Sequence, residues 1–284
     1  MWTVNRILGG IVGGLLYPFQ ALPPIIGLAV VSLLVSVPLM LGFRALSDQD
    51  ALAAAKRRIH AGVFEIRLFN DDLGAITRAQ IEIVRHTLSY FRLSFIPMAW
   101  MMIPLILLLI QLQFHYGYEG LETGRSAILK VQFAAGESAQ AGLGRPADDA
   151  VSAVSLEAPP GLTVETPMLW IPTLREADWR VTANQPGSYP VSVRVGEDRF
   201  SKSVVFSDAG LRRSPRRPSR GFFDQLLYPA EPPMPAGAPI ESITVNYPDG
   251  RVSLFGWHTH WLVGFFILTM LFSLLLQKPL RVRL

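Results

Sequence analysis

Three long apolar runs constrain this chain more than any other feature of its sequence. They cover residues 25–43, 93–114 and 257–276, and each is long enough to cross the roughly 30 Å hydrocarbon layer of a bilayer as a helix. A short, charged connection (44–92) joins the first two runs, whereas a much longer one (115–256) joins the last two. We therefore predict an integral membrane protein with three transmembrane helices, whose two connections lie on opposite sides.

Composition limits the classes of function that the chain can have. Half of the residues are hydrophobic and 17% are charged, so the polar residues must be concentrated in particular segments. The absence of cysteine excludes disulfides and thiolate metal sites but does not fix the compartment. The pI of about 9.6 could suggest nucleic-acid binding, but the basic residues flank apolar runs and no recognition motif accompanies them. We interpret them as topology signals and expect no nucleic-acid partner.

The distribution of Lys and Arg predicts the orientation of the helices. Residues 44–92 carry eight of them, and the tail adds Lys278, Arg281 and Arg283, whereas the N-terminal segment holds only Arg6. Short loops rich in Lys and Arg remain in the cytoplasm. The first connection and the C-terminal tail are therefore predicted to be cytoplasmic, and the N-terminus and the long connection to lie outside.

The N-terminal segment, residues 1–24, is predicted to be an interfacial amphipathic helix on the outer surface. A signal peptide is the first alternative, but the segment has no clear small-x-small cleavage site and leads directly into the first apolar run. A fourth span is the second, but the stretch is short, rich in glycine and interrupted at Pro18.

Residues 44–92 have an apolar period close to that of an α-helix. Two apolar stripes are separated by Asn70, Asp71 and Asp72, which can form helix caps and a tight turn. The pattern predicts an antiparallel, coiled-coil-like helical hairpin in the cytoplasm. The hairpin could be a spacer, or it could contact the ribosome, a nascent chain or a partner subunit.

Residues 115–210 are predicted to form an extracytoplasmic β-sandwich. Short runs of alternating apolar and polar residues are separated by turn residues, and they lie at 127–133, 179–182, 189–195 and 200–206. The turn and strand at 159–164, with Trp179 and the Gly187-Ser188-Tyr189 sequence, resemble bacterial immunoglobulin-like modules over about 80 residues. The small, polar segment 136–149 is expected to be a mobile loop.

Residues 211–256 are interpreted as a basic linker and a membrane-surface segment. The run 212–220 is too rich in proline and charge to be expected to pack, and the apolar residues 222–228 follow it. Attraction to anionic lipid head groups and burial of the aromatic side chains would anchor this segment, with nucleic-acid binding as the alternative. A strand-like stretch at 240–247 then leads to the third helix and the cytoplasmic tail, 257–284.

No pattern for catalysis appears in the sequence. There is no cysteine nucleophile, no His-Glu-x-x-His and no phosphate loop, so we expect no enzymatic activity and no cofactor. His115 ends the second apolar run, while His258 and His260 begin the third on the same predicted side. Three neighbouring imidazoles could bind copper or zinc. Histidines beside several aromatic residues are more often members of an interfacial belt, and we favour that interpretation over a metal site.

The overall pattern resembles the YidC-type membrane insertase superfamily. It is most similar to the three-span branch related to the third subunit of the ER membrane protein complex and to the Get insertase. The resemblance covers residues 1–116 and 250–284. It rests on the topology, on the run Phe-Glu-Ile-Arg-Leu-Phe-Asn-Asp-Asp-Leu at 64–73, on the start of the third apolar run at 256–261 and on Lys278-Pro279. It implies a bacterial member of the superfamily in the inner membrane.

The resemblance implies a physical mechanism rather than a covalent one. A hydrophilic groove in a thinned bilayer lowers the cost of taking a polar segment into the membrane, and a basic residue in it attracts substrate carboxylates. Arg44 is the best match for that residue and Arg92 the second. Arg44 stands at the cytoplasmic end of its span rather than within it, where it could also mark the boundary. Polar residues that could line the groove are Ser36, Gln111, Gln113, Thr269, Ser273 and Gln277.

Three functions are consistent with the sequence. The first is a membrane-protein insertase or membrane chaperone, for which Arg44→Glu should abolish activity. The second is a structural or accessory subunit of a larger membrane complex, with the sandwich and the hairpin as docking surfaces. The third is a metal-linked or sensory membrane protein that depends on His258 and His260. Partners are therefore lipids and other membrane proteins, as substrates or as fellow subunits.

Overall fold

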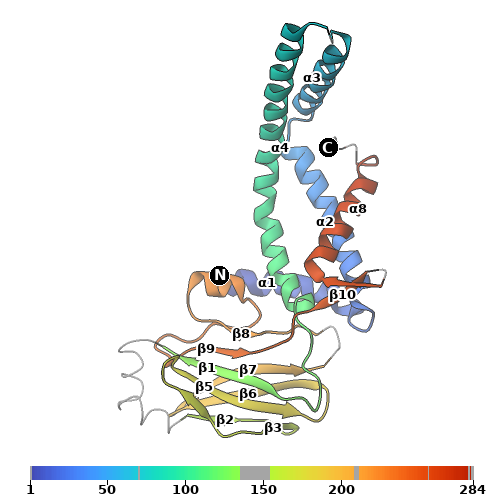
Figure 1. Ribbon diagram of the computed structural model, residues 1–284. Helices are drawn as coiled ribbons and strands as arrows, with labels where there is room; N and C mark the ends of the chain where they lie inside the picture. The colour runs from blue at the N-terminus through green and yellow to red at the C-terminus, as the bar shows by residue number, and fades with distance from the viewer. Residues whose placement is uncertain are drawn as a thin grey trace. The chain divides into compact units, whose positions relative to one another are not determined.

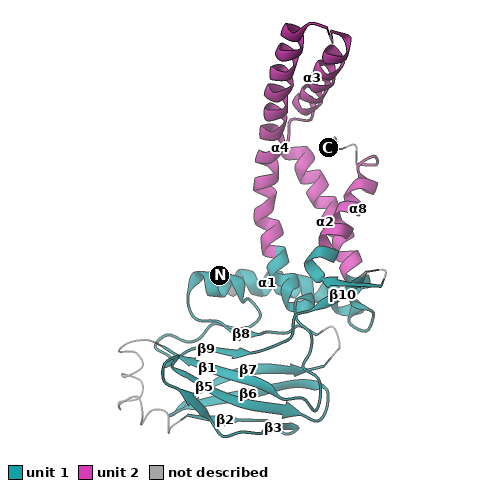
Figure 2. Cartoon of the chain, viewed as in Figure 1, with its two compact units in different colours: residues 1–27, 108–264 teal, residues 28–107, 265–284 magenta. Residues whose placement is uncertain are grey.

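The computed structural model describes residues 2–69, 71–134, 154–207, 211–254, 256–280 and 282. The chain forms two compact units, one made of Met1–Gly27 with Leu108–Gly264 and the other of Leu28–Leu107 with Phe265–Leu284 (Figure 2). The first unit contains the β-strands, and the second contains most of the long helices. The predicted combination of helices with a β-domain is confirmed.

The first unit is built on two antiparallel sheets (Figure 1). The larger sheet has the order β3 (Leu162–Val164), β5 (Glu176–Ala183), β1 (Ala127–Phe133), β9 (Ile240–Val245) and β8 (Arg216–Arg217), and β4 (Leu169–Ile171) also pairs with β5. The smaller sheet has the order β2 (Val154–Glu157), β6 (Gly187–Val195) and β7 (Asp198–Phe206).

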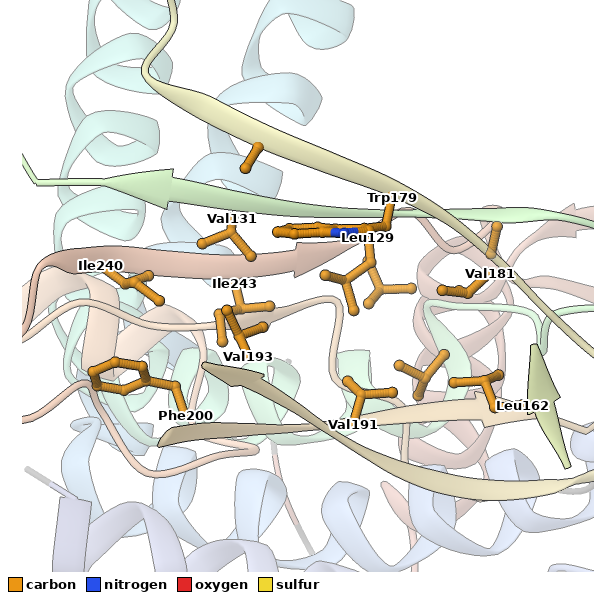
Figure 3. Close-up of a cluster of buried hydrophobic side chains, with 14 of the residues drawn as sticks. Leu129, Val131, Leu162, Trp179, Val181, Val191, Val193, Phe200, Ile240 and Ile243 are labelled. Carbon is orange, nitrogen blue, oxygen red and sulfur yellow. The ribbon is translucent and has the colours of Figure 1, made fainter. Parts of the chain in front are cut away.

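Side chains from both sheets share one hydrophobic core. Alternate residues of β1 are buried, which places Leu129 and Val131 on the inner face because successive side chains of a strand point to opposite faces. They meet Val191 and Val193 of the smaller sheet in one buried cluster (Figure 3). The strands expected at 127–133, 179–182, 189–195 and 200–206 all lie within observed strands.

The expected end of the β-domain at residue 210 is wrong. Strands β8 and β9 lie beyond it and extend the larger sheet, so the segment interpreted as an unpacked basic linker is part of the fold. Proline is tolerated there because β8 is a two-residue strand at the sheet edge. The stretch expected at 240–247 is confirmed as β9. The loop expected at 136–149 lies outside the described residues.

The first unit also contains short helices and a small hairpin. Helix α1 (Trp2–Leu16) is followed by the 3-10 helix η1 (Tyr17–Phe19), and α7 (Phe222–Leu227) follows β8. Strand β10 (Arg251–Leu254) pairs with β11 (Trp257–His260). Gly256 lies between them with a φ of 85°, a conformation that favours glycine.

Four longer helices complete the chain, namely α2 (Pro24–Leu46), α3 (Gln49–Leu68), α4 (Leu73–Tyr116) and α8 (Trp261–Leu276). Helix α2 matches the first apolar run. The second run has no boundary at residue 93, because α4 continues through it for 44 residues. Two of these helices, α2 and α4, are long and apolar enough to cross a membrane.

The helix of the third apolar run begins later than expected. Residues 257–260 form β11 rather than the first turn of a helix, so α8 has only 16 residues. At about 1.5 Å per residue it is roughly 24 Å long, which is shorter than the roughly 30 Å hydrocarbon layer.

In the second unit, α3 and the first part of α4 occupy the two arms expected for residues 44–92. Asp48 begins α3, because its carboxylate accepts hydrogen bonds from the backbone N–H groups of Asp50 and Ala51. Asp72 begins α4 in the same way, with Gly74 and Ala75 as donors. Asn70, also expected in the turn, lies outside the described residues.

Gly62 sets how closely the two arms approach. A Cβ atom at this position would lie 2.7 Å from Cγ1 of Ile83. We expect Gly62→Leu to destabilise the pairing of α3 with α4 by about 1–3 kcal/mol through overpacking. Faster amide hydrogen exchange in α3 would measure the effect. The neighbouring exposed substitution Ala61→Leu is the control, and equal exchange in both variants would contradict the close approach.

Candidate functional site

The second unit carries hydroxyl groups on the buried faces of two apolar helices. On α2, the residues Leu28, Val31, Ser32, Ser36 and Met40 are buried, at intervals that place them on one helix face. The Ser36 hydroxyl donates a hydrogen bond to the Ser32 carbonyl oxygen over 2.6 Å. The Ser32 hydroxyl itself has no partner within the described residues.

Helix α8 presents a similar face. Phe265 is fully buried and Thr269, one turn further on, is 9% exposed. The Thr269 hydroxyl also has no hydrogen-bond partner in the described part of the chain. Small residues such as serine let helices approach closely in membranes. That role explains the size of Ser32, but it leaves both unpaired hydroxyls unexplained.

A basic cavity of about 410 Å³ lies in the second unit, beside residues 52–60 of α3. Its charged wall comes from one face of α3, with Lys56, Arg57 and His60, and no acidic residue is among the side chains that line it. The full lining consists of Leu52, Ala53, Lys56, Arg57, His60, Tyr90, Gln277 and Val282. Such a wall favours an anionic group over a cationic one.

The two candidate groove arginines are both exposed. Arg44 lies in the last turn of α2, and its Nη1 donates to the carbonyl oxygen of Leu280 over 3.0 Å. It therefore holds the segment after α8, which contributes Gln277 to the basic cavity. Arg92 lies on the surface of α4, where no hydrogen bond or ion pair of its side chain is found among the described residues.

The polar candidates separate into two groups. Ser36 and Thr269 are buried in the second unit, and Ser273 and Gln277 are half-buried there. Gln111 and Gln113 instead belong to the first unit. Gln111 accepts a hydrogen bond from Arg212 Nη2 over 3.1 Å, and Gln113 accepts one from Trp261 Nε1 over 3.0 Å. These hydrogen bonds fix the end of α4, and the expected groove role of the two glutamines stays a prediction.

The basic segment after β7 is likewise a structural element that the sequence did not reveal. Arg213 and Arg217 are largely buried. Arg213 donates to the carbonyl oxygens of Tyr118 and Ser207, each over 2.9 Å. Arg217 donates to those of Ser201 and Pro232. Backbone carbonyls of neighbouring segments thus occupy these two guanidinium groups, and the expected contact of the segment with lipid head groups stays a prediction.

The histidines do not assemble into a metal site. His115 is buried near the end of α4, whereas His258 and His260 lie exposed on β11. Within the described ranges, no group of three or more His, Cys, Asp or Glu side chains could hold a metal ion. The copper or zinc hypothesis gains no support from the arrangement of the described residues.

The long apolar helix α4 is almost uncovered. Only 6% of its most apolar 18-residue window is buried within the chain. Its exposed side chains include Met98, Trp100, Met102, Ile103 and Ile106. A soluble monomer rarely exposes a continuous apolar surface of this kind, so lipid or another protein must cover it.

Comparisons with protein-family models, with curated proteins and with solved structures find no match for this chain. The geometry of the two units therefore carries what can be inferred about its function.

Proposed function

We propose that this chain is a membrane-protein insertase or membrane chaperone of the YidC type, which uses a polar surface inside the bilayer and no covalent chemistry. The observation that carries the proposal is the pair of unpartnered hydroxyls, Ser32 and Thr269, on buried faces of apolar helices. A polar group without a partner is costly in hydrocarbon. A polar client segment that displaces the side chains covering these hydroxyls, together with water that accompanies it, would supply the missing partners.

The uncovered face of α4 supports the same function. A client that is leaving water needs an apolar surface that adapts to many side chains, and methionine is well suited because its side chain is flexible and polarisable. Met98 and Met102 are both about half exposed on this face. The basic cavity beside Arg57 and His60 would attract client carboxylates at the mouth of the site.

The proposed topology has three spans, formed by α2, the apolar part of α4 and α8. A span as short as α8 is accommodated by a locally thinned bilayer, and thinning lowers the barrier to a polar segment. Lys and Arg in the short connection support a cytoplasmic hairpin and tail, with the N-terminus and β-domain outside, in a bacterial inner membrane. The hairpin of α3 and α4 would then be available to a ribosome or a nascent chain.

The β-domain is proposed to be immunoglobulin-like. The order β9-β1-β5-β3 opposite β2-β6-β7 corresponds to the A-B-E-D and C-F-G sheets of that fold, with β9 in the place of strand A. The Tyr189 hydroxyl donates to the carbonyl oxygen of Gln185 over 2.8 Å, as a tyrosine corner does. In this assignment the first strand of the fold is supplied last by the chain.

Insertion into liposomes tests the proposal. The purified chain is reconstituted with a single-span client that carries a short polar tail, and protection of the tail from protease reports insertion. We expect Ser32→Ala with Thr269→Val to slow insertion about 30-fold, because two hydrogen bonds of about 1 kcal/mol each are lost. Thermal stability should not fall, since both changes remove unpaired buried hydroxyls.

The control is Leu34→Ala, on the exposed side of α2, which should leave the insertion rate close to that of the unmodified chain. Arg44→Lys should also retain activity, because a lysine can still donate to the Leu280 carbonyl, whereas Arg44→Glu should lose it. Full insertion by the Ser32→Ala, Thr269→Val variant would mean that the hydroxyls serve only helix packing.

An accessory subunit of a larger membrane complex is the second candidate function. The observation that favours it is again the apolar surface of α4, which fellow subunits could cover instead of lipid and clients. Purification from native membranes in mild detergent separates the two functions. Partners that remain bound in a fixed ratio would support the subunit, whereas many partners in substoichiometric amounts would support the chaperone.

A further inference from the structure

Two helices of the first unit, far apart in the sequence, lie side by side and are tied together. Helices α1 and α7 contact each other (Figure 1). The Asn5 side chain is 2% exposed, and its Nδ2 donates to the carbonyl oxygen of Gln225 over 2.6 Å. A buried amide with this partner fixes the position of α7 against α1.

Packing against the first unit fixes which face of α1 turns outward. A Cβ atom at Gly9 would lie 2.8 Å from Arg212 Nη1 and 3.1 Å from Gln111 Oε1, so the glycine allows α1 to lie directly on these side chains. Val12 and Leu16 continue the same buried face. The opposite side of the helix is left without cover.

That uncovered side is apolar, and α7 extends it. The large apolar side chains on this side of α1 and on α7 are between 38% and 73% exposed. Those of α1 recur at intervals of three and four residues, as one helix face requires. We name this surface the apolar shelf, and it consists of Val4, Ile7, Ile11, Leu15, Phe222, Phe223 and Leu227.

The shelf ends where the first apolar span begins. Helix α2 starts at Pro24, and a Cβ atom at Gly27 would lie 3.7 Å from Leu16 Cδ2 and 3.3 Å from Phe19 Cβ. The first turn of α2 therefore packs directly on the end of α1. Tyr17, between the two helices, is 73% exposed, and tyrosine is enriched at the level of lipid head groups. An apolar face that is continuous with the start of a span meets the bilayer interface.

We infer that the apolar shelf is a lipid-binding surface that inserts into the leaflet at which α2 begins, and that it holds the β-domain against the membrane. Its occupant is the boundary between head groups and acyl chains. The inference rests on α2 crossing the bilayer and does not require insertase activity. It joins the interfacial helix and the surface segment at 222–228, which were expected separately, into one surface, so that a segment of the β-domain itself binds lipid.

Spin labels can test this inference without background, because the chain has no cysteine. Single cysteines at Ile7, Ile11 and Phe223 are labelled in the full chain, reconstituted at one copy per lipid nanodisc. Leu169→Cys on β4 is the matched aqueous control, and Leu34→Cys on α2 is the lipid control. All five side chains are exposed, at 47% or more, so the labels can be carried without disturbing the cores. Collision rates with oxygen and with a water-soluble nickel chelate are then measured.

Labels on the shelf are expected to collide more with oxygen and less with the nickel chelate than the label at Leu169. The ratio of the oxygen collision rate to the nickel collision rate should shift toward that of the label at Leu34. The shift should be smaller than for Leu34, because the shelf lies nearer to the head groups. Nickel access equal to that of Leu169 would place the shelf in water and overturn the inference. Exclusion of both agents, with a strongly immobilised spectrum, would show a protein partner or a second copy there and would overturn it too. A water-exposed Leu34 would refute the span itself, while failure of the insertion assay would leave all these accessibilities unchanged.

Discussion

Substitution of Glu231 by glutamine should destabilise the β-domain by about 3–5 kcal/mol, because it leaves a buried charge without its counterion. Lys202 has no exposed side-chain surface, and its Nζ lies 2.9 Å from Oε1 of Glu231. The same Nζ donates to the Ser214 carbonyl oxygen over 2.6 Å. Lys202 therefore connects β7 both to the segment that leads into β8 and to the segment that follows α7. Loss of amide protection in these strands during hydrogen exchange would measure the effect.

Two variants make this expectation specific. Glu176→Gln removes one of the two carboxylate partners of Lys130, whose side chain is 39% exposed, and should cost less than about 1 kcal/mol. Lys202→Met combined with Glu231→Gln should recover most of the stability, since the double variant no longer holds an uncompensated buried charge. A large loss in the Glu176 variant, or no recovery in the double variant, would contradict the role assigned to the buried pair.

The pH dependence follows from the same burial. Burial lowers the pKa of Lys202 below its ordinary value of 10.5, and Glu231 opposes that shift. Between the lowered native pKa and 10.5, the unfolded chain binds more protons than the native one, so the free energy of unfolding rises with pH. The opposing charge is absent in Glu231→Gln, so the native pKa of Lys202 is lowered further in this variant. Its stability deficit should therefore narrow as the pH rises from the native Lys202 pKa of the variant to that of the unmodified chain, and should stay constant above it.

The second large effect is expected for Gly120→Ala, at about 3–5 kcal/mol, from overpacking together with lost hydrogen bonds. A Cβ atom at Gly120 would overlap the carbonyl oxygen of Ser207, which is backbone and cannot rotate away. The same region holds the hydrogen bonds from Leu121 to Val205 and from Arg213 to Ser207. Moving the chain to admit the methyl group would lengthen both.

The matched control is Gly10→Ala on α1, where nothing lies within 4 Å of the added Cβ. It should stabilise the helix by about 0.5–1 kcal/mol, because alanine loses less backbone entropy than glycine. Hydrogen exchange of β7 would compare the two variants. Equal protection in both would mean that the backbone near Gly120 can yield without cost.

Sequence periodicity was sufficient to predict those elements whose buried and exposed faces follow the local alternation of apolar and polar residues. The alternation at 127–133 predicted β1 within its observed bounds, because one face of that strand is buried and the other is not. Long-range pairing could not be read in this way. Gln111 is polar within an apolar run, and its partner Arg212 lies 101 residues away, so a groove and a structural bond give the same local signal.

Two errors share a physical cause. Hydropathy assigned residues 257–260 to a span, but their pairing with β10 decides the backbone conformation. Charge assigned the arginines after β7 to an unpacked linker, but backbone carbonyls from other segments accept their hydrogen bonds. In both cases a hydrogen-bonding partner outside the segment outweighs local propensity, and the composition of the segment carries no information on that partner.

Strands β1 and β9, which bring the chain into and out of the sandwich, are direct neighbours, and their register sets how the domain responds to tension. Leu129 near the start of β1 pairs with Val245 at the end of β9, and the bridge between Tyr118 and Asp249 continues this alignment toward the helices. Both connections thus leave the ladder from the same end. A force that pulls α4 and α8 apart would break the hydrogen bonds between β1 and β9 one pair at a time, starting at that end, rather than load all of them together. The pairing of β1 with β9 would therefore separate under a smaller force than a ladder whose hydrogen bonds are all loaded at once.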